Sequence, residues 1–373
     1  MSKYELTIST DYVRDWGFLQ ALREFVQNAL DEGRQNPDNT YFFHYDKETQ
    51  TFTIGNKHSV LNIDSLLLGV TTKSDDKHTI GQFGEGYKIA TMVLLRTGHT
   101  VTFYNYGAKE VWTTKLVKSR RYGGQMVPTF YVDKNYPWQS TPDNDLTIKI
   151  GNVTEEEYES LVDYILLFQK DLGKTLDCDV VGTILLEEKF KGKVFVSGLY
   201  VCTNDRLNYG YDIKPEYLTL DRDRQTIADF DLLWVTSRMW GRQITDAAFR
   251  KLFFSESNYD IHYLDSMVSY SSLSESVLEE FYAKYGTNAI PVSSQEEFDV
   301  IKSLGGHPVF VSRPVATCLR PLYTTFTSTT EEHTSCYDML KSWYDELYDQ
   351  VTIPESLNSR FLWILDTYES DLK

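Results

Sequence analysis

The hydrophobic positions near the start of the chain repeat with the period of an α-helix. Between Phe18 and Leu30 the apolar side chains recur every three or four residues, which places them on one helical face. These positions are Phe18, Leu22, Phe25, Val26, Ala29 and Leu30. The pattern predicts an amphipathic helix that buries this face in the core.

Shorter runs of aromatic and β-branched residues follow and predict strands. Thr40–Tyr45 and Gln50–Ile54 flank a turn at Asp46–Lys47 and predict a hairpin. A short helix over Asn62–Leu68 and a mostly apolar helix over Tyr87–Arg96 come next. Further strands are predicted at Thr100–Tyr104, Val111–Val117, Thr129–Val132 and Leu146–Ile150. The order predicts an α+β fold, a sandwich with helices on one face of a mixed, mostly antiparallel sheet.

The same patterns predict three domains, with boundaries at 1–172, 173–270 and 271–373. A helix over Thr154–Leu172 closes the first domain, and strands at Gly182–Glu187 and Lys193–Val201 belong to the second. The third alternates between helices and strands, which predicts a small α/β and helical module. Its predicted elements are Ser276–Tyr285, Ala289–Val292, Gln295–Leu304, Pro308–Val311, Tyr337–Tyr348 and Pro354–Tyr368.

Composition and charge narrow the classes of function. The chain has 373 residues, of which 41% are hydrophobic and 24% charged, and this favours a soluble globular protein. Its apolar runs are shorter than the roughly 20 residues that cross a bilayer, and its first residues lack the layout of a signal peptide. Four widely spaced cysteines predict reduced thiols in the cytoplasm. A net charge of −17 argues against non-specific nucleic-acid binding, although an average leaves a local basic groove open.

Three polar residues share one sector of the first predicted helix. Glu24, Asn28 and Asp31 lie opposite its apolar face. A solvated face is one interpretation, but Asn28 is only a moderate helix former and has no capping role in the middle of a helix. Its amide oxygen is suited to ligate Mg²⁺. Glu24, one turn earlier, could then accept a proton from a water that attacks a phosphate.

Three glycines precede the second apolar helix. Gly81, Gly84 and Gly86 allow backbone N–H groups to close around phosphate oxygens, and the helix N-terminus adds a partial positive charge. Lys88 lies in the first helical turn, where a cation is unfavourable unless an anion is bound. A simple tight turn before the helix is the alternative interpretation.

Together these motifs resemble the GHKL, or Bergerat-fold, ATPase superfamily of gyrase B, the large heat-shock chaperones, histidine kinases and MutL. Glu24, Asn28 and Ala29 match its E-x-x-x-N-A helix, with Asp31 also in register. The glycine signature of the chaperone branch, I-G-Q-F-G-x-G, is matched by Ile80, Gly81, Gln82, Phe83, Gly84 and Gly86. Small stand-alone members of the superfamily occur in bacteria and phages.

The resemblance implies roles for these residues and two cofactors, ATP and Mg²⁺. Glu24 would polarise the attacking water and Asn28 would hold Mg²⁺. The segment 71–86 would form a lid over the nucleotide, with Lys73 near the phosphates. The glycine loop, with Gln82 and Phe83, and Lys88 would complete the nucleotide site.

One motif departs from the family pattern. The superfamily has I-x-D-x-G-x-G between the two signatures, with the Asp accepting a hydrogen bond from adenine. Here Asn56 stands in place of that Asp, and His58 and Val60 replace the two glycines. An Asn oxygen still accepts such a bond, but without charge. The departure leaves open whether affinity and base selectivity are altered.

A second resemblance lies at Leu218–Gln225, which is similar to the chaperone segment that brings an arginine to the terminal phosphate. Arg224 is the residue in register and Arg222 the near alternative. A surface loop of alternating Asp and Arg is the other interpretation. A guanidinium from a second domain would couple hydrolysis to domain position.

The sequence therefore predicts an ATP-binding, slowly hydrolysing conformational switch, built from a Bergerat-type domain, a transducer-like domain and a C-terminal module. Lid closure, ATP-dependent homodimerisation and an unknown protein partner are implied by the resemblance. One alternative is a nucleotide-sensing module without turnover. Another is a DNA-acting ATPase of the gyrase or microrchidia type, against which the acidity of the chain weighs.

Overall fold

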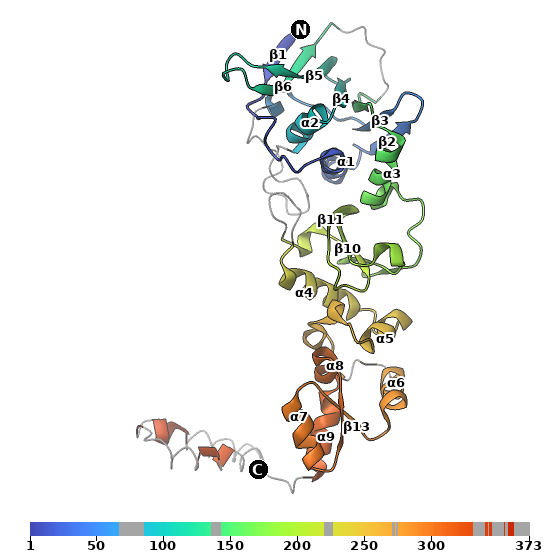
Figure 1. Cartoon of the computed structure of the whole chain (residues 1–373), viewed down its shortest axis with the longest axis vertical. Coiled ribbons are helices and arrows are strands. Elements are labelled where there is room, and N and C mark those ends of the chain that lie inside the picture. The colour runs from blue at the N-terminus through green and yellow to red at the C-terminus, as the bar shows by residue number, and fades with distance from the viewer. Residues whose placement is uncertain are drawn as a thin grey trace. The chain divides into compact units, whose positions relative to one another are not determined.

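The structure is a computed structural model that describes residues 1–66, 86–135, 143–219, 227–270, 273 and 275–330, with short stretches after 339. The chain divides into two compact units, Met1–Gln243 and Ile244–Lys373 (Figure 1). In the described residues no helix is long and apolar enough to cross a membrane. The three domain boundaries predicted from the sequence stay a prediction.

The first unit opens with a seven-stranded sheet in the order β1-β6-β5-β4-β7-β3-β2. Every neighbouring pair in this sheet is antiparallel. The strands are β1 (Ser2–Glu5), β2 (Tyr41–Asp46), β3 (Thr51–Asn56), β4 (Thr100–Asn105), β5 (Glu110–Lys118), β6 (Met126–Asp133) and β7 (Leu146–Gly151). The predicted hairpin and the four further predicted strands are confirmed, and the sequence patterns missed β1.

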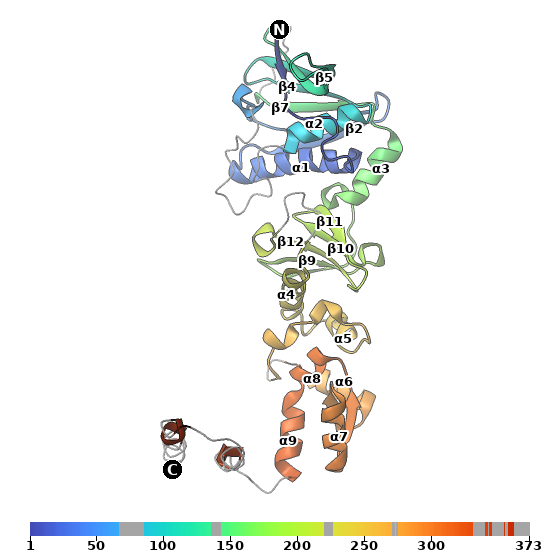
Figure 2. The ribbon, with the colours of Figure 1, turned by 60° about the vertical axis from the view of Figure 1, so that its left-hand side comes forward.

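Helices α1 (Phe18–Gln35) and α2 (Gly86–Arg96) cover one face of this sheet (Figure 2). The apolar stripe of α1, including Leu22 and Phe25, packs with Met92 and Val93 of α2 in one core. From the sheet, Phe103 lies in the same core and its ring contacts those of Phe25, Trp112 and Phe130. The predicted α+β class, with helices on one face of an antiparallel sheet, is confirmed.

A second, five-stranded sheet follows in the order β11-β10-β12-β9-β8. Its strands are β8 (Thr175–Asp177), β9 (Gly182–Leu185), β10 (Lys193–Val196), β11 (Leu199–Thr203) and β12 (Gly210–Ile213). Strands β10 and β12 are parallel, and helix α4 (Asp229–Trp240) packs on β9. The Trp240 indole donates a 2.8 Å hydrogen bond to the Tyr211 hydroxyl, which fixes α4 against this sheet.

Two elements predicted after the large sheet have other boundaries in the structure, and these predictions are wrong. The single strand predicted at Lys193–Val201 is two strands, because Ser197 and Gly198 take positive φ angles of 53° and 80° and turn the chain back. The helix predicted at Thr154–Leu172 is α3 (Glu155–Tyr164), followed by a 3-10 turn at Leu166–Phe168. Helix α3 ends because Ile165 is extended and pairs with Leu199 of β11.

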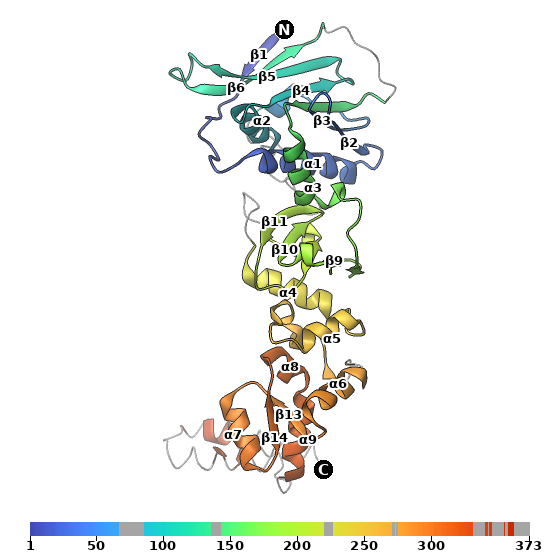
Figure 3. The same ribbon diagram turned by 45° about the vertical axis from the view of Figure 1, so that its right-hand side comes forward.

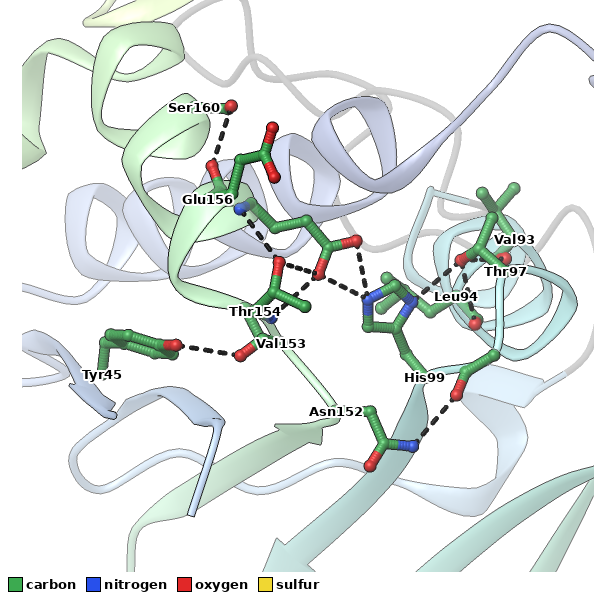
Figure 4. Close-up of polar contacts among 12 residues, drawn as sticks. Tyr45, Val93, Leu94, Thr97, His99, Asn152, Val153, Thr154, Glu156 and Ser160 are labelled. Atoms are coloured by element: carbon green, nitrogen blue, oxygen red, sulfur yellow. Dashed lines mark hydrogen bonds and ion pairs between the residues drawn. The ribbon is translucent and has the colours of Figure 1, made fainter. Parts of the chain in front are cut away.

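A polar cluster fixes the start of α3 to the corner between α2 and β4 (Figure 4). The His99 ring lies 2.9 Å from the Thr97 hydroxyl through Nδ1 and 3.2 Å from the Glu157 carboxylate through Nε2. Glu157 also accepts from the backbone N–H of Thr154, whose hydroxyl accepts from the Glu157 N–H in a capping box. Burial raises the pKa of Glu157, but the bonds from Thr154 and His99 outweigh it, so the pKa is lowered overall.

The second unit contains a parallel pair of strands, β13 (Ala289–Val292) and β14 (His307–Phe310), joined through α7 (Gln295–Ser303). Ile290, Val292 and Ile301 form its core. The other helices are α5 (Ala247–Phe253), α6 (Glu275–Tyr285), α8 (Arg313–Cys318) and α9 (Arg320–Thr330).

Short 3-10 turns of both units lie at Ile63–Leu66, Glu188–Phe190, Pro215–Tyr217, Tyr259–Ile261 and Leu264–Ser266. The α/β elements predicted between 276 and 311 are confirmed within one residue, whereas those at 337–348 and 354–368 lie largely outside the described residues.

We expect Glu157→Gln to lower the free energy of unfolding at neutral pH by about 1–2 kcal/mol, since a charged acceptor is lost. A carboxyl whose pKa is lowered by folding stabilises above its unfolded pKa, and this contribution disappears as pH falls through the folded pKa. The difference between wild type and variant should therefore be full at pH 7 and vanish in acid, as measured by urea denaturation from pH 7 to pH 3. Glu156→Gln, an exposed neighbour in the same helical turn, is the control and should show no such pH-dependent difference.

Candidate functional site

The polar sector of α1 is buried rather than solvated. Glu24 is 5% exposed and Asp31 is fully buried, while Asn28 is half-buried. Arg23 and Gln27 on the same helix are also buried. Burial of charged groups is costly unless they are held by partners, so the interpretation of this sector as a solvated face is wrong for Glu24 and Asp31. Helix α1 is buried on both its apolar and its polar sides.

The Glu24 carboxylate lies directly against Gly86, the first residue of α2. A Cβ built on Gly86 would fall 2.1 Å from Oε2 of Glu24 and 3.3 Å from its Cδ. Only a residue without a side chain allows this approach. The structure thus joins the helix motif to the last glycine of the glycine motif, 62 positions away in the sequence. The carboxylate stands at the N-terminal end of a helix, where unpaired N–H groups favour negative charge.

Asn28 is oriented by its own helix. Its Nδ2 donates a 2.8 Å hydrogen bond to the carbonyl oxygen of Glu24, one turn earlier. With the nitrogen turned to the backbone, the side-chain oxygen is the atom that can serve a ligand. An amide oxygen is a ligand type that Mg²⁺ accepts. The residue therefore fits the role of a metal ligand that the sequence predicts.

Asp31 and Lys88 add two more buried charges. Asp31 Oδ1 lies 3.6 Å from the Arg34 guanidinium, three residues later on α1. Lys88 is fully buried in the first turn of α2, with its Nζ 5.7 Å from the centre of the Tyr87 ring. A buried cation beside a helix N-terminus opposes the helix dipole. This arrangement favours a site that receives an anionic group.

Asn56 ends β3 and makes a structural bond that the sequence did not predict. Its Nδ2 donates to the carbonyl oxygens of Ala29 at 2.8 Å and Asn39 at 2.9 Å. Both of its N–H groups thus tie β3 to α1 and to the loop after α1. An aspartate has no N–H to give to these carbonyls and could not make these two bonds. The Asn56 oxygen is the remaining polar atom of the side chain.

Glu32 is a residue of this region that the sequence analysis missed. Its carboxylate accepts from Asn39 at 2.7 Å, from Asn36 at 3.3 Å and from the Ser59 hydroxyl at 3.5 Å. These bonds hold the loop after α1 and the segment after β3. Glu32 lies eight residues after Glu24 and therefore on the same helical face, which is the signal that could have identified it.

The remaining predicted site residues lie outside the described residues. They are Lys73, Gly81, Gln82, Phe83, Gly84 and Arg224, with its alternative Arg222. The structure thus brings Glu24 against Gly86. Asn28 and Asp31 belong to α1 itself. Lys88 lies on α2 and Asn56 on β3, and both of these elements contact α1.

Comparisons with known proteins give weak likenesses. No protein-family model matches the chain. An uncharacterized protein of Mycoplasma pneumoniae is 25% identical over 228 residues, which span 57% of this chain and 87% of that protein.

The solved structures that resemble the chain include ATPase regions of topoisomerase II. The region from Saccharomyces cerevisiae, with dexrazoxane bound, aligns with a TM-score of 0.31 and 10% identity over 49% of this chain and 62% of that structure, less than two thirds of its length. The ATPase and transducer domains from Balamuthia mandrillaris align with a TM-score of 0.33 and 11% identity over 56% and 76%. These scores are too low to support a shared site or a shared function.

We expect Gly86→Ala to displace the Glu24 carboxylate, because the new methyl group would overlap Oε2. A displacement of about 1 Å at a reacting group lowers a rate by about a hundredfold, so any ATP turnover should fall by that order while the fold is kept. Gly33→Ala in α1 is the matched control, since its Cβ would meet only ordinary contacts at 3.5 Å and beyond. It should keep turnover and raise stability by about 0.5–1 kcal/mol. Equal turnover in both variants would contradict the placement of Glu24.

We expect Asn56→Asp to destabilise the first unit by about 1–3 kcal/mol, although Asp is the residue of the motif that the sequence resembles. Two buried backbone carbonyls would lose their donors and face a carboxylate instead. Urea denaturation measures the change, and Asn135→Asp, at an exposed position, serves as the control. Unchanged stability with tighter nucleotide binding would show that the two bonds to the backbone are dispensable.

Proposed function

We propose that this chain is an ATP-binding conformational switch of the GHKL ATPase superfamily that hydrolyses ATP slowly in the presence of Mg²⁺. The two sequence motifs support this proposal, and so does the fold class. The observation that carries it is the contact between the Glu24 carboxylate and Gly86. If α1 were a surface helix and the glycine run a simple turn, the two motifs would have no reason to meet. In the structure Glu24 of the first motif contacts Gly86 of the second.

The described residues suit the chemistry of in-line attack by water on a terminal phosphate. Glu24 is a buried carboxylate at a helix N-terminus, and it would accept a proton from the attacking water. Lys88 would offset the charge of the phosphates. Asn28 would hold Mg²⁺ through its side-chain oxygen, and the ion, when bound, neutralises charge on the phosphate oxygens. The Asn56 oxygen would accept a hydrogen bond from the adenine amino group.

The switch itself is proposed from the resemblance. The segment 71–86 would close over the nucleotide, and Arg224 would contact the terminal phosphate only while that phosphate is present. Closure would limit the rate of turnover and favour a homodimer. The output would act on a protein partner in the cytoplasm.

A nucleotide-sensing module without hydrolysis is the second candidate, and the Asn56 contacts favour keeping it. Because both N–H groups of Asn56 are used by the backbone, its oxygen alone is left for the base, without the charge of an aspartate. Such a pocket could bind ATP and still not turn it over.

We expect Glu24→Gln to lower Mg²⁺-dependent ATP turnover by about 10²–10⁴-fold, since the general base is removed, while ATP binding by calorimetry is retained. Glu48→Gln, in the exposed turn between β2 and β3, is the control and should behave as wild type. If the wild-type chain binds ATP but its phosphate release equals that of Glu24→Gln, the sensor is correct and the ATPase is not. Failure of both proteins to bind ATP would reject a nucleotide site altogether.

A further inference from the structure

The positive charge of this acidic chain is concentrated in one segment. Between Arg96 and Lys134 there are seven Lys or Arg residues and two acids, Glu110 and Asp133, a local excess of five positive charges in a chain whose net charge is −17. This segment forms β4, β5 and β6 of the seven-stranded sheet. At physiological salt, charges more than about 8–10 Å away are largely screened. The charge of this segment, and not the net charge of the whole chain, therefore acts on a ligand bound there.

The register of the strands places Lys115 of this segment, together with Lys149 of β7, on the face of the sheet opposite α1 and α2, here called the outer face. Lys149 of β7 is flanked by the core-facing Ile148 and Ile150, so its own side chain lies on the outer face. A cross-strand row runs through it, consisting of Lys3, Tyr131, Thr113, Thr102, Lys149, Thr53 and His44. None of these seven residues is buried. Lys115 lies two residues beyond Thr113 on the same face and is exposed.

The hairpin between β5 and β6 extends the basic surface beyond the edge of the helices (Figure 3). Its turn carries the exposed residues Lys118, Arg120 and Arg121. Within the described part of the chain no ion pair holds these three residues, Lys115 or Lys149. Some other surface cations are paired, as Lys47 is with Glu155 and Lys134 with Glu110. Arg121 interacts electrostatically with Glu5, and the gathering of five cations on one surface of a chain with 54 acidic residues favours an external anion.

Aromatic rings and hydroxyl groups lie between these cations. The Lys149 Nζ is 5.4 Å from the centre of the Tyr104 ring, and the Arg121 guanidinium is 5.5 Å from that of Tyr122. The hydroxyls of Thr53, Thr102 and Thr113 make no hydrogen bond to the described residues. Lysine, arginine and hydroxyl side chains contact phosphates and sugars, and exposed rings stack on unpaired bases. An acidic protein surface would pair with the cations but would make no use of the neighbouring rings and hydroxyl groups.

We infer that the outer face and the β5–β6 turn bind single-stranded nucleic acid through its sugar–phosphate backbone. Strands lie about 4.8 Å apart and rise about 3.4 Å per residue, so Lys149 on β7 and Lys115 on β5 are about 12 Å apart. A strand that runs from Lys149 over Lys115 to Arg120 and Arg121 meets a cation every few nucleotides. This site goes beyond the proposed function, and it lies on the side of the sheet away from helix α1, which carries Glu24 and Asn28.

The test is fluorescence anisotropy of a labelled 20-nucleotide oligo-dT with the full chain between 50 and 200 mM NaCl. Four to five phosphate contacts give a slope of log K against log salt of about −3. The triple variant Lys115→Gln, Arg120→Gln, Arg121→Gln should bind at least tenfold more weakly at the lowest salt, with a slope shallower by about 2. The control Lys47→Gln, Lys57→Gln, Lys191→Gln changes the net charge equally but alters only paired cations outside the basic segment, and it should bind as wild type.

Several results would overturn the inference. They are no binding at 50 mM NaCl, equal losses in the two triple variants, competition by polyglutamate as effective as that by unlabelled oligo-dT, and tighter binding of a 20-base-pair duplex. A dimer of the chain that dissociates in the first triple variant would instead assign the surface to a second copy. None of these measurements uses ATP turnover, so their failure leaves the nucleotide-site proposal untouched, and the two triple variants should keep wild-type turnover.

Discussion

The burial of helix α1 on both of its faces is the constraint on which the rest of the first unit depends. Its apolar stripe fills the core beneath the sheet, as an amphipathic helix should. Its polar sector, with Arg23, Glu24, Gln27 and Asp31, is buried as well. Such burial costs free energy unless each group is held by a partner. The contact of Glu24 with Gly86 shows how the cost is limited, since the carboxylate meets the N-terminal end of α2 and not an apolar surface.

The same helix is linked to the second sheet through Tyr164 of α3 and through the charge of Arg34. Tyr164 at the end of α3 is hydrogen-bonded to Gln20 of α1, and its ring lies 4.8 Å from that of Tyr200 in β11. Asp212 of β12 accepts a 2.7 Å hydrogen bond from the Gly198 N–H. Burial raises the pKa of Asp212 to about 6, although Gly198 and the charge of Arg34 act in the opposite direction. Arg34 also pairs with Asp31, so one guanidinium acts on a carboxylate of the site and on one of the second sheet.

Sequence patterns predicted the long periodic elements and failed where distant contacts decide. Helix α1 and the strands of the large sheet follow from the spacing of apolar residues, because each buries one face. The end of α3 could not be predicted, since Ile165 leaves the helix to pair with Leu199, a residue 34 positions later. The burial of Glu24 and Asp31 was also unpredictable, because an amphipathic pattern gives the same letters for a solvated and a buried polar face. The helix and glycine motifs indicated a ligand site at this polar sector, whereas helical periodicity alone indicated a solvated surface.

Asn56 shows why a departure from a motif need not mean loss of the site. A single amide both donates to two backbone carbonyls and keeps an acceptor oxygen. The amide therefore supports α1 and the loop after it, while its oxygen stays available to a ligand. Net charge misleads in a similar way, because −17 describes the whole chain and not the outer face and the β5–β6 turn, where cations gather. In both cases the local partners of a residue, and not its type or its contribution to an average, determine what it can bind.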